Sequence, residues 1–200
     1  SWYGLNNIGW NAAKQLQGKE LSYNNLLDLE SALSTVLEFE YDQKQNSSKI
    51  INAAVILKHN NPCGAALADS ASDAFREALA CDSTSAFGGI VAFNNNVDLA
   101  TAELLSNIFL ECVVAPSFDK DALEMLNIKK NLRLLQLNKE NITLENKATF
   151  KSILGGILEQ DNDNEIDQQN EWSFVTQIKP STEELNAVSY THLRAHETSR

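Results

Sequence analysis

A lysine and a histidine stand side by side where an apolar segment of the chain ends. Residues 53–57 read AAVIL and are followed by Lys58, His59 and the turn-forming sequence NNPCG. This pattern predicts a buried strand that ends in a turn, with Lys58 and His59 at the carboxyl end of the strand. Ligands of open α/β sheets bind at such strand ends. Because histidine titrates near neutral pH and lysine carries a proton there, the pair suits acid-base chemistry on a nucleophilic amine.

The same two residues allow a second interpretation, in which they only cap a strand end at the protein surface. Adjacent side chains of a strand point to opposite faces. Lys58 and His59 therefore reach one pocket only if the backbone bends at the turn formed by Asn60, Asn61 and Pro62.

Three further residues, at two places in the chain, are of types that could contact a ligand. Gly88 and Gly89 follow Phe87 directly before an apolar segment, and they indicate either loop punctuation or a strained turn that lets a ligand approach the backbone. Glu111 precedes the apolar segment 112–116. It is either a solvated helix end or an acceptor of hydrogen bonds from hydroxyls or an exocyclic amine.

The elements that must position these residues alternate along the chain. Apolar spacing and turn residues predict helices over 26–39, 70–80, 98–109 (with Asp98 as N-cap) and 122–126, and strands over 53–57, 89–93, 112–116, 132–137 and 153–158. Residues 1–15 read as irregular, and residues 42–49 and 161–169 read as polar loops. The alternation predicts an α/β fold with a largely parallel sheet covered by helices.

Composition narrows the class of protein. Two hundred residues with 43% hydrophobic content predict a globular chain of one or two domains. Sixteen Lys and Arg residues against 27 Asp and Glu residues give a net charge of -11, which argues against nucleic acid and anionic membranes as partners. Three cysteines without a C-x-x-C pair favour a reducing compartment, and no apolar stretch reaches the roughly 20 residues of a membrane span. A cytoplasmic location follows as the expectation.

Four segments resemble, in order, the transformylase portion of the bifunctional purine-biosynthesis enzymes that combine AICAR transformylase with IMP cyclohydrolase. They are QLQGKELSYNNLLD (15–28), VILKHNNPCG (55–64), ACDSTSAFGGIVAF (80–93) and FLECVVAP (109–116). The resemblance covers residues 11–186. It implies transfer of a formyl group from 10-formyltetrahydrofolate to the 5-amino group of AICAR, on a cytidine-deaminase-like sheet with helices on both faces.

The resemblance also implies roles for individual residues. His59 matches the general base that takes a proton from the attacking amine. Lys58 matches the group that stabilises charge on the formyl oxygen or assists protonation of the departing folate nitrogen. Gly88 and Glu111 match positions that contact the nucleotide, and Thr84 lies where the folate side of the cleft approaches.

No metal is expected at this site. The deaminase-like enzymes of this family lack zinc, and a zinc deaminase requires P-C-x-x-C, whereas Pro62 and Cys63 are followed here by Gly-Ala-Ala. The acidic stretch 161–169 lacks the glycine and the final glutamate of a calcium loop.

The chain departs from the family at both ends. The family's Arg-Tyr-Gly phosphate-binding segment has no arginine in Trp2-Tyr3-Gly4, and the cyclohydrolase domain is missing. We therefore expect an irregular lead-in at 1–14, a partial transformylase domain at 15–186 comprising the first deaminase-like half and a connecting segment, and a non-native tail at 187–200 that resembles translated adapter or vector sequence.

Two functions remain open at this point. The first is a fragment of a transformylase whose family members are homodimers with active sites built across the interface, so that these residues alone have little or no activity. The second is a noncatalytic nucleotide-binding α/β module, in which Lys58 and His59 only neutralise a phosphate.

Overall fold

The computed structural model describes residues 8–46, 51–142, 148–161, 173–185 and 187. The chain forms two compact units, Ser1–Thr143 and Leu144–Arg200. The boundary falls inside the range 15–186 that the sequence suggested as one partial domain. The first unit holds a six-stranded sheet with its helices, and the second holds a two-stranded hairpin.

The sheet of the first unit is mixed rather than largely parallel. Its spatial order is β1 (Lys14–Gln17), β6 (Arg133–Gln136), β5 (Leu110–Ala115), β4 (Gly89–Phe93), β2 (Asn52–Lys58) and β3 (Asn61–Ala68). Only the pairs β4/β5 and β5/β6 are parallel. The pairs β1/β6, β2/β3 and β2/β4 are antiparallel. The prediction of a largely parallel sheet was wrong because β2 continues into β3 through a tight turn instead of a helical crossover.

Two of these strands were not predicted. β1 begins within the segment read as irregular, and β3 follows the Lys58 turn directly. The sequence of β3, NPCGAALA, contains proline and glycine and few β-branched residues, so it lacks the composition of a strand. It forms because pairing with the apolar strand β2 supplies its hydrogen bonds.

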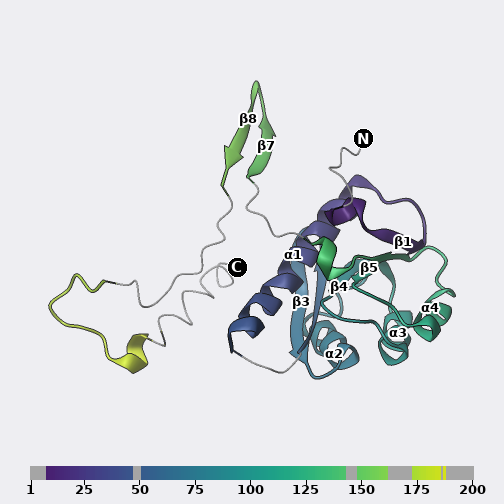
Figure 1. Cartoon of the computed structure of the whole chain (residues 1–200), viewed down its shortest axis with the longest axis horizontal. Coiled ribbons are helices and arrows are strands. Elements are labelled where there is room, and N and C mark those ends of the chain that lie inside the picture. Colours follow the sequence, from purple (N-terminus) through teal and green to yellow (C-terminus); the bar gives the residue numbers. More distant parts are fainter. Residues whose placement is uncertain (1–7, 47–50, 143–147, 162–172, 186, 188–200) are drawn as a thin grey trace. The chain divides into compact units, whose positions relative to one another are not determined.

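Helices cover both faces of the sheet, as predicted (Figure 1). On one face, α1 (Tyr23–Asn46) packs against alternate residues of the strands, including Val55, Leu57, Ile90 and Cys112. On the other face lie α2 (Ala71–Cys81), α3 (Leu99–Ser106) and α4 (Lys120–Leu126), packed against Ile56, Val91 and Val113. Single turns of 3-10 helix occur at η1 (Gly9–Asn11) and η2 (Lys139–Asn141).

The helix boundaries correct the predictions at two places. α1 continues through residues 42–46, which were expected to be a loop. α3 ends at Ser106 rather than at Phe109, so that β5 begins at Leu110. The predicted N-cap of α3 is confirmed, since the Thr101 backbone N–H donates to Asp98 Oδ1 at 2.9 Å.

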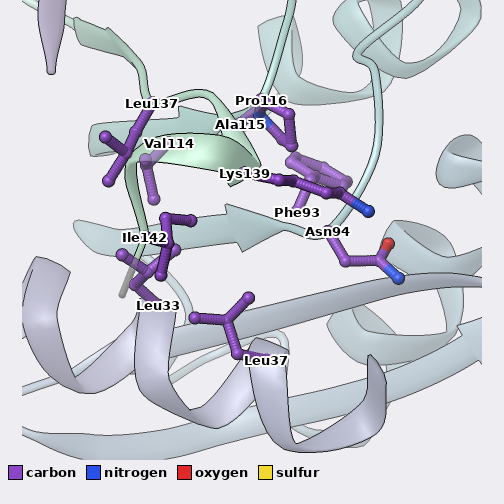
Figure 2. Close-up of a pocket in the computed structure, with 10 residues that line it drawn as sticks. All are labelled: Leu33, Leu37, Phe93, Asn94, Val114, Ala115, Pro116, Leu137, Lys139 and Ile142. Atoms are coloured by element: carbon purple, nitrogen blue, oxygen red, sulfur yellow. The ribbon is translucent and has the colours of Figure 1, made fainter. Parts of the chain in front are cut away.

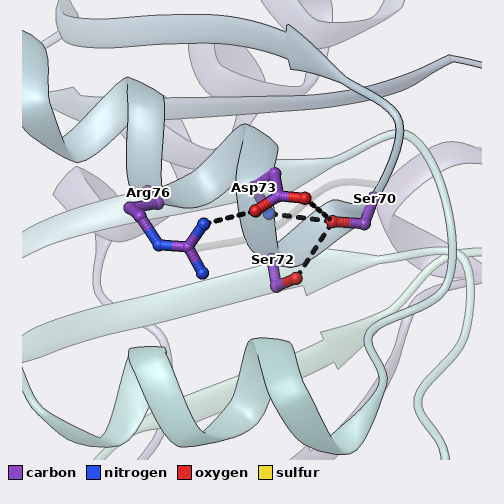
Figure 3. A network of polar contacts seen from close by, with 4 residues as sticks. All are labelled: Ser70, Ser72, Asp73 and Arg76. Carbon is purple, nitrogen blue, oxygen red and sulfur yellow. Dashed lines mark hydrogen bonds and ion pairs between the residues drawn. The ribbon is translucent and has the colours of Figure 1, made fainter.

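The start of α2 is fixed by a small polar network (Figure 3). Ser70 Oγ accepts from the backbone N–H of Asp73 at 3.0 Å and donates to the Asp73 carboxylate at 2.7 Å. Arg76 pairs with the same carboxylate one turn later, and both partners lower the pKa of Asp73. A cap of this kind contributes about 1 kcal/mol, and it anchors the helix that leads into the loop carrying Thr84 and Gly88.

The second unit corrects the prediction of one buried strand over 153–158. Strand β7 (Thr149–Ile153) pairs with β8 (Gly156–Gln160) in an antiparallel hairpin. Leu154 and Gly155 form the turn, where Gly155 has φ 78°. All residues of the two strands are exposed. The predicted acidic loop over 161–169 and the predicted non-native tail over 187–200 fall, apart from Asp161 and Ala187, outside the described residues.

Among the described residues, no helix combines the length and the apolar character that crossing a membrane requires.

Candidate active site

Lys58 and His59 lie at the junction of β2 and β3. Lys58 is the last residue of β2 and pairs with Asn61, so His59 and Asn60 alone make the turn. Both have positive φ, 53° and 58° respectively. Two central residues with positive φ are typical of the type I′ turn that connects antiparallel strands. The backbone therefore bends one residue earlier than the sequence suggested, and His59 leaves the alternation of the strand.

The Lys58 side chain points toward the α2 side of the sheet. Leu57 packs on the α1 side, and Lys58 Nζ donates to the carbonyl oxygen of Phe87 at 2.8 Å. Burial raises the pKa of the Cys63 thiol, and the Asp82 carboxylate raises this pKa further, whereas the Lys58 ammonium lowers it. The Lys58 ammonium thus contacts the Phe87 carbonyl oxygen and influences the Cys63 thiol through its charge.

The loop between α2 and β4 carries Thr84 and Gly88. Its first turn is held by Asp82, whose carboxylate accepts from the Ser85 backbone N–H at 2.9 Å and from the Ser85 hydroxyl at 2.6 Å. These hydrogen bonds lower the pKa of Asp82. Thr84 is exposed, and its carbonyl oxygen accepts from the Phe87 N–H at 3.4 Å.

The glycine pair forms a turn rather than simple loop punctuation. Gly88 has φ 76°, and its N–H donates to the carbonyl oxygen of Phe109 at 2.8 Å. Gly89 lies so close to β2 that a Cβ atom there would stand 3.0 Å from the carbonyl oxygen of Leu57. The backbones of β2, β4 and the segment before β5 therefore meet at Gly88 and Gly89.

Sequence reasoning missed the two aromatic side chains beside this turn. The ring centroids of Phe87 and Phe109 lie 5.2 Å apart. The exposed fraction is 60% for Phe87 and 50% for Phe109. The available signal was that Phe87 directly precedes a glycine and that Phe109 stands at the predicted end of a helix, both within the resembling segments.

Glu111 is a strand residue and not the solvated helix end of the alternative interpretation. The register of β5 on β4 shifts between Leu110 and Cys112, so Glu111 is the extra residue of a bulge. Its Oε2 accepts from Asn25 Nδ2 of α1 at 2.8 Å. Cys112 is buried on the same side, and burial raises the pKa of its thiol to about 12.

Asn25 was not among the predicted site residues. It is buried, and its backbone N–H, Oδ1 and Nδ2 all form hydrogen bonds. Its backbone N–H donates to Ser22 Oγ at 3.1 Å, and its Oδ1 accepts from the Ser22 N–H at 3.1 Å. This reciprocal pair has the form of a capping box at the start of α1. Asn25 therefore fixes the start of α1 and the Glu111 carboxylate together.

The predicted residues gather at one edge of the sheet, for a reason the sequence did not show. Lys58 ends β2, whereas Gly89 and Leu110 begin β4 and β5. Because β2 runs antiparallel to β4, the carboxyl end of β2 lies beside the amino ends of β4 and β5. Leu57 pairs with Ile90, and Gly89 pairs with Leu110. The edge brings Lys58 and Gly88 together on the α2 side, while Glu111 is held by Asn25 on the α1 side.

A pocket lies at the opposite edge, between α1 and the carboxyl ends of β4 and β5 (Figure 2). It is lined by Leu33, Leu37, Phe93, Asn94, Val114, Ala115, Pro116, Leu137, Lys139 and Ile142. None of the predicted site residues is among them. The Asn94 side chain is bound to the backbone, accepting from the Ala53 N–H at 2.7 Å and donating to the Ile51 carbonyl oxygen at 3.0 Å.

Within the part of the chain that the structure describes, no group of three or more His, Cys, Asp or Glu residues is arranged to hold a metal ion.

Comparison with solved structures gives weak similarity. RibD from Acinetobacter baumannii, form 1, is 16% identical over 54% of this chain and 35% of that chain, with a TM-score of 0.43. Its form 2 gives a TM-score of 0.42 at 15% identity over 56% of this chain and 36% of that chain. TM-scores of this size do not establish a common fold.

Comparison of sequences is far more informative. The bifunctional purine biosynthesis protein PurH of Prochlorococcus marinus strain MIT 9515 is 64% identical over 92% of this chain and 35% of its own length. PurH of strain CCMP1986 is 63% identical over 94% of this chain and 37% of its own length. The chain thus spans about a third of the length of these curated relatives. The model of the AICARFT/IMPCHase bienzyme family matches residues 1–197, and the chain belongs to this family.

Proposed function

We propose that this chain is part of an AICAR transformylase, which transfers a formyl group from 10-formyltetrahydrofolate to the 5-amino group of AICAR in purine (IMP) biosynthesis. Membership of the AICARFT/IMPCHase bienzyme family supports this reaction class. The single structural observation in its favour is the contact of 2.8 Å between Lys58 Nζ and the Phe87 carbonyl oxygen. It puts a cation beside the Gly88 turn, at the edge where the His59 turn lies and where the strand that carries Glu111 begins.

In the proposed mechanism, His59 is the general base and Lys58 the electrostatic group. The amino nitrogen of AICAR attacks the formyl carbon and gives a proton to the His59 imidazole. The bond between the formyl carbon and the folate N10 then breaks, and N10 gains a proton. Lys58 stabilises the negative charge on the formyl oxygen or assists this protonation. The exposed position of His59 at the tip of its turn agrees with a role in reaching a substrate.

Three further residues are proposed to bind substrates. The Glu111 carboxylate, oriented by Asn25, would accept hydrogen bonds from the nucleotide. Gly88 would contact the nucleotide through its backbone, because glycine has no side chain that would block the approach. Thr84, on the exposed part of the same loop, would face the folate. The exposed rings of Phe87 and Phe109 offer apolar surface beside these residues that a planar ring system can cover.

We propose the remaining properties from the family and from composition. The fold would be cytidine-deaminase-like, without zinc, and the complete protein would be a cytoplasmic homodimer that also carries IMP cyclohydrolase activity. The net charge of -11 disfavours nucleic acid as a partner. Within the chain, 1–14 would be a lead-in, 15–186 a partial transformylase domain and 187–200 a non-native tail. The family match extends to residue 197, so sequencing the native gene beyond residue 186 tests the tail directly.

The decisive experiment compares His59→Ala with the unchanged protein after the missing segments have been restored. If His59 is a base, the variant loses turnover while its affinity for AICAR is largely retained. Equal loss of turnover and affinity would favour the alternative, a noncatalytic nucleotide-binding module. The 200 residues alone are expected to show little or no formyl transfer, and robust turnover by them would contradict the proposal.

A further inference from the structure

The turn that carries His59 has a backbone conformation that needs external support. His59 and Asn60 both lie in the left-handed region, with φ 53° and 58°. This conformation is strained for residues other than glycine, and such strain persists only where neighbouring groups hold it. Asparagine tolerates the region better than most residues, whereas histidine at the first position is less common in turns of this type. A group outside the hairpin is therefore expected to hold the turn.

That group is on α1. Asp28 Oδ1 accepts a hydrogen bond from the backbone N–H of Asn60 at 2.8 Å. Ser31, three residues later, donates its hydroxyl to Asn60 Oδ1 at 3.4 Å. Within the hairpin, Asn61 Nδ2 donates to the His59 carbonyl oxygen at 2.9 Å. The peptide that follows His59 is thus held from both sides.

These contacts belong to one stripe of α1. Asn25, Asp28 and Ser31 recur every three residues, which places them on one face of a helix. Asn25 binds the Glu111 carboxylate, and Asp28 and Ser31 bind the His59 turn. The first three turns of α1 therefore connect two parts of the candidate site that are separated along the chain.

We propose that Asp28 is a positioning residue for His59, acting through the backbone of Asn60; this inference rests on the proposed role of His59 as a base. A carboxylate that accepts a backbone N–H forms a strong, charge-assisted hydrogen bond. It fixes the peptide plane after His59 and with it the direction in which the imidazole leaves the backbone. Asp28 touches neither the substrate nor the reacting atoms in this role.

The test uses the complete enzyme with Asp28→Ala, Asp28→Asn and, as a matched control, Glu38→Ala at an exposed position of the same helix. A catalytic group displaced by 1 Å can cost up to 100-fold, so Asp28→Ala is expected to lower kcat about tenfold while KM for AICAR changes less than about twofold. The amide oxygen of Asp28→Asn can accept the same N–H, so kcat is expected to recover to within about threefold. Glu38→Ala leaves both constants unchanged.

A second readout follows the contact itself. Hydrogen exchange of the Asn60 amide is expected to become about tenfold faster in Asp28→Ala, because a local hydrogen bond is lost, and to stay near the unchanged rate in Asp28→Asn. Unaltered exchange in Asp28→Ala would overturn the proposal. Faster exchange of the Asn60 amide in Asp28→Ala without a change in kcat would also overturn it. If Asp28→Ala fails to fold, Asp28→Leu supplies the same comparison, because leucine is of similar size and favours helices but has no hydrogen-bond acceptor. Wild-type kcat with wild-type Asn60 exchange in Asp28→Leu overturns the proposal.

The failure of this inference can be told apart from the failure of the proposed function. If His59→Ala keeps full turnover, the assignment of the base is wrong, and the positioning role falls with it. If His59→Ala abolishes turnover while Asp28→Ala does not lower kcat, only the positioning role is wrong.

Discussion

The two edges of the six-stranded sheet differ in shape and in chemistry. The edge where β2 ends and β4 and β5 begin carries Lys58, His59 and Glu111, with exposed aromatic rings beside them. The opposite edge holds an apolar pocket whose buried amide, Asn94, is used to bind the backbone of neighbouring segments. The pocket of Figure 2 and the candidate reactive groups therefore lie at different edges in this unit.

This difference limits a common rule about α/β proteins. Ligands of open parallel sheets bind at the carboxyl ends of the strands, which here means the edge with the apolar pocket. The candidate site instead lies at the amino ends of β4 and β5, because the antiparallel strand β2 delivers its carboxyl end there. The direction of one strand decides which edge receives Lys58 and His59.

The largest expected effect is a difference in kcat between a substitution at the candidate edge and one at the opposite edge. In the complete enzyme, His59→Ala is expected to lower kcat by about 100- to 10,000-fold, the usual contribution of a general base. Lys139→Met, which removes the cation lining the opposite pocket, is expected to leave kcat within about twofold. Steady-state assays of formyl transfer measure both. A larger loss of kcat in Lys139→Met than in His59→Ala would contradict the assignment of the active site to the edge that carries His59.

Asn25 and Asn94 are both buried, and each lies at a different edge, so that they allow a matched test. Asn25→Ala and Asn94→Ala each remove hydrogen bonds from a buried site and are expected to lower the free energy of unfolding by about 1–3 kcal/mol. Denaturant titration measures this loss. Only Asn25→Ala is expected to raise KM for AICAR, by about tenfold, because it frees the Glu111 carboxylate. An equal rise in KM for Asn94→Ala would remove the distinction between the edges.

The Gly88 turn is expected to show a smaller, conformational effect. At φ 76°, Gly88→Ala places a side chain in the left-handed region and should cost about 1–2 kcal/mol. Steric conflict adds little, since the new Cβ would stand 3.6 Å from the Phe109 ring. Gly156→Ala in β8 serves as the control, because a Cβ there meets its nearest neighbour only at 4.0 Å. Thermal unfolding that ranks Gly156→Ala as the more damaging change would contradict this account.

The last expected effect, which is absent at neutral pH, is a pH dependence of stability at the candidate edge. Burial raises the pKa of Cys112 from its ordinary value of 9.0 to about 12. Between these values the unfolded thiol is ionised while the folded thiol keeps its proton, so stability is complete below pH 9 and falls as pH rises toward 12. The slope is at most about 1.4 kcal/mol per pH unit. Cys112→Ala should flatten this part of the stability profile, and an unchanged slope would count against the assignment.

Local patterns in the sequence were sufficient for much of this fold. The apolar segments of β2, β4 and β5 predicted strands, and Asp98 predicted the start of α3. The pair Gly88 and Gly89 indicated a turn as one alternative, and Gly88 has the positive φ that glycine adopts without steric cost. Each of these features depends on residues close together in the chain, where composition and spacing carry the information.

The arrangement of the candidate site was decided by tertiary structure. The pairing of β2 with β3 and β4 set the edge, and β3 itself has no strand-like composition. Asn25 and Glu111 are 86 positions apart, and Asp28 and Asn60 are 32 apart, yet each pair shares a hydrogen bond of 2.8 Å. Such contacts arise from the packing of α1 on the sheet. Apolar burial drives this packing, and burial depends on which surfaces meet rather than on any local pattern.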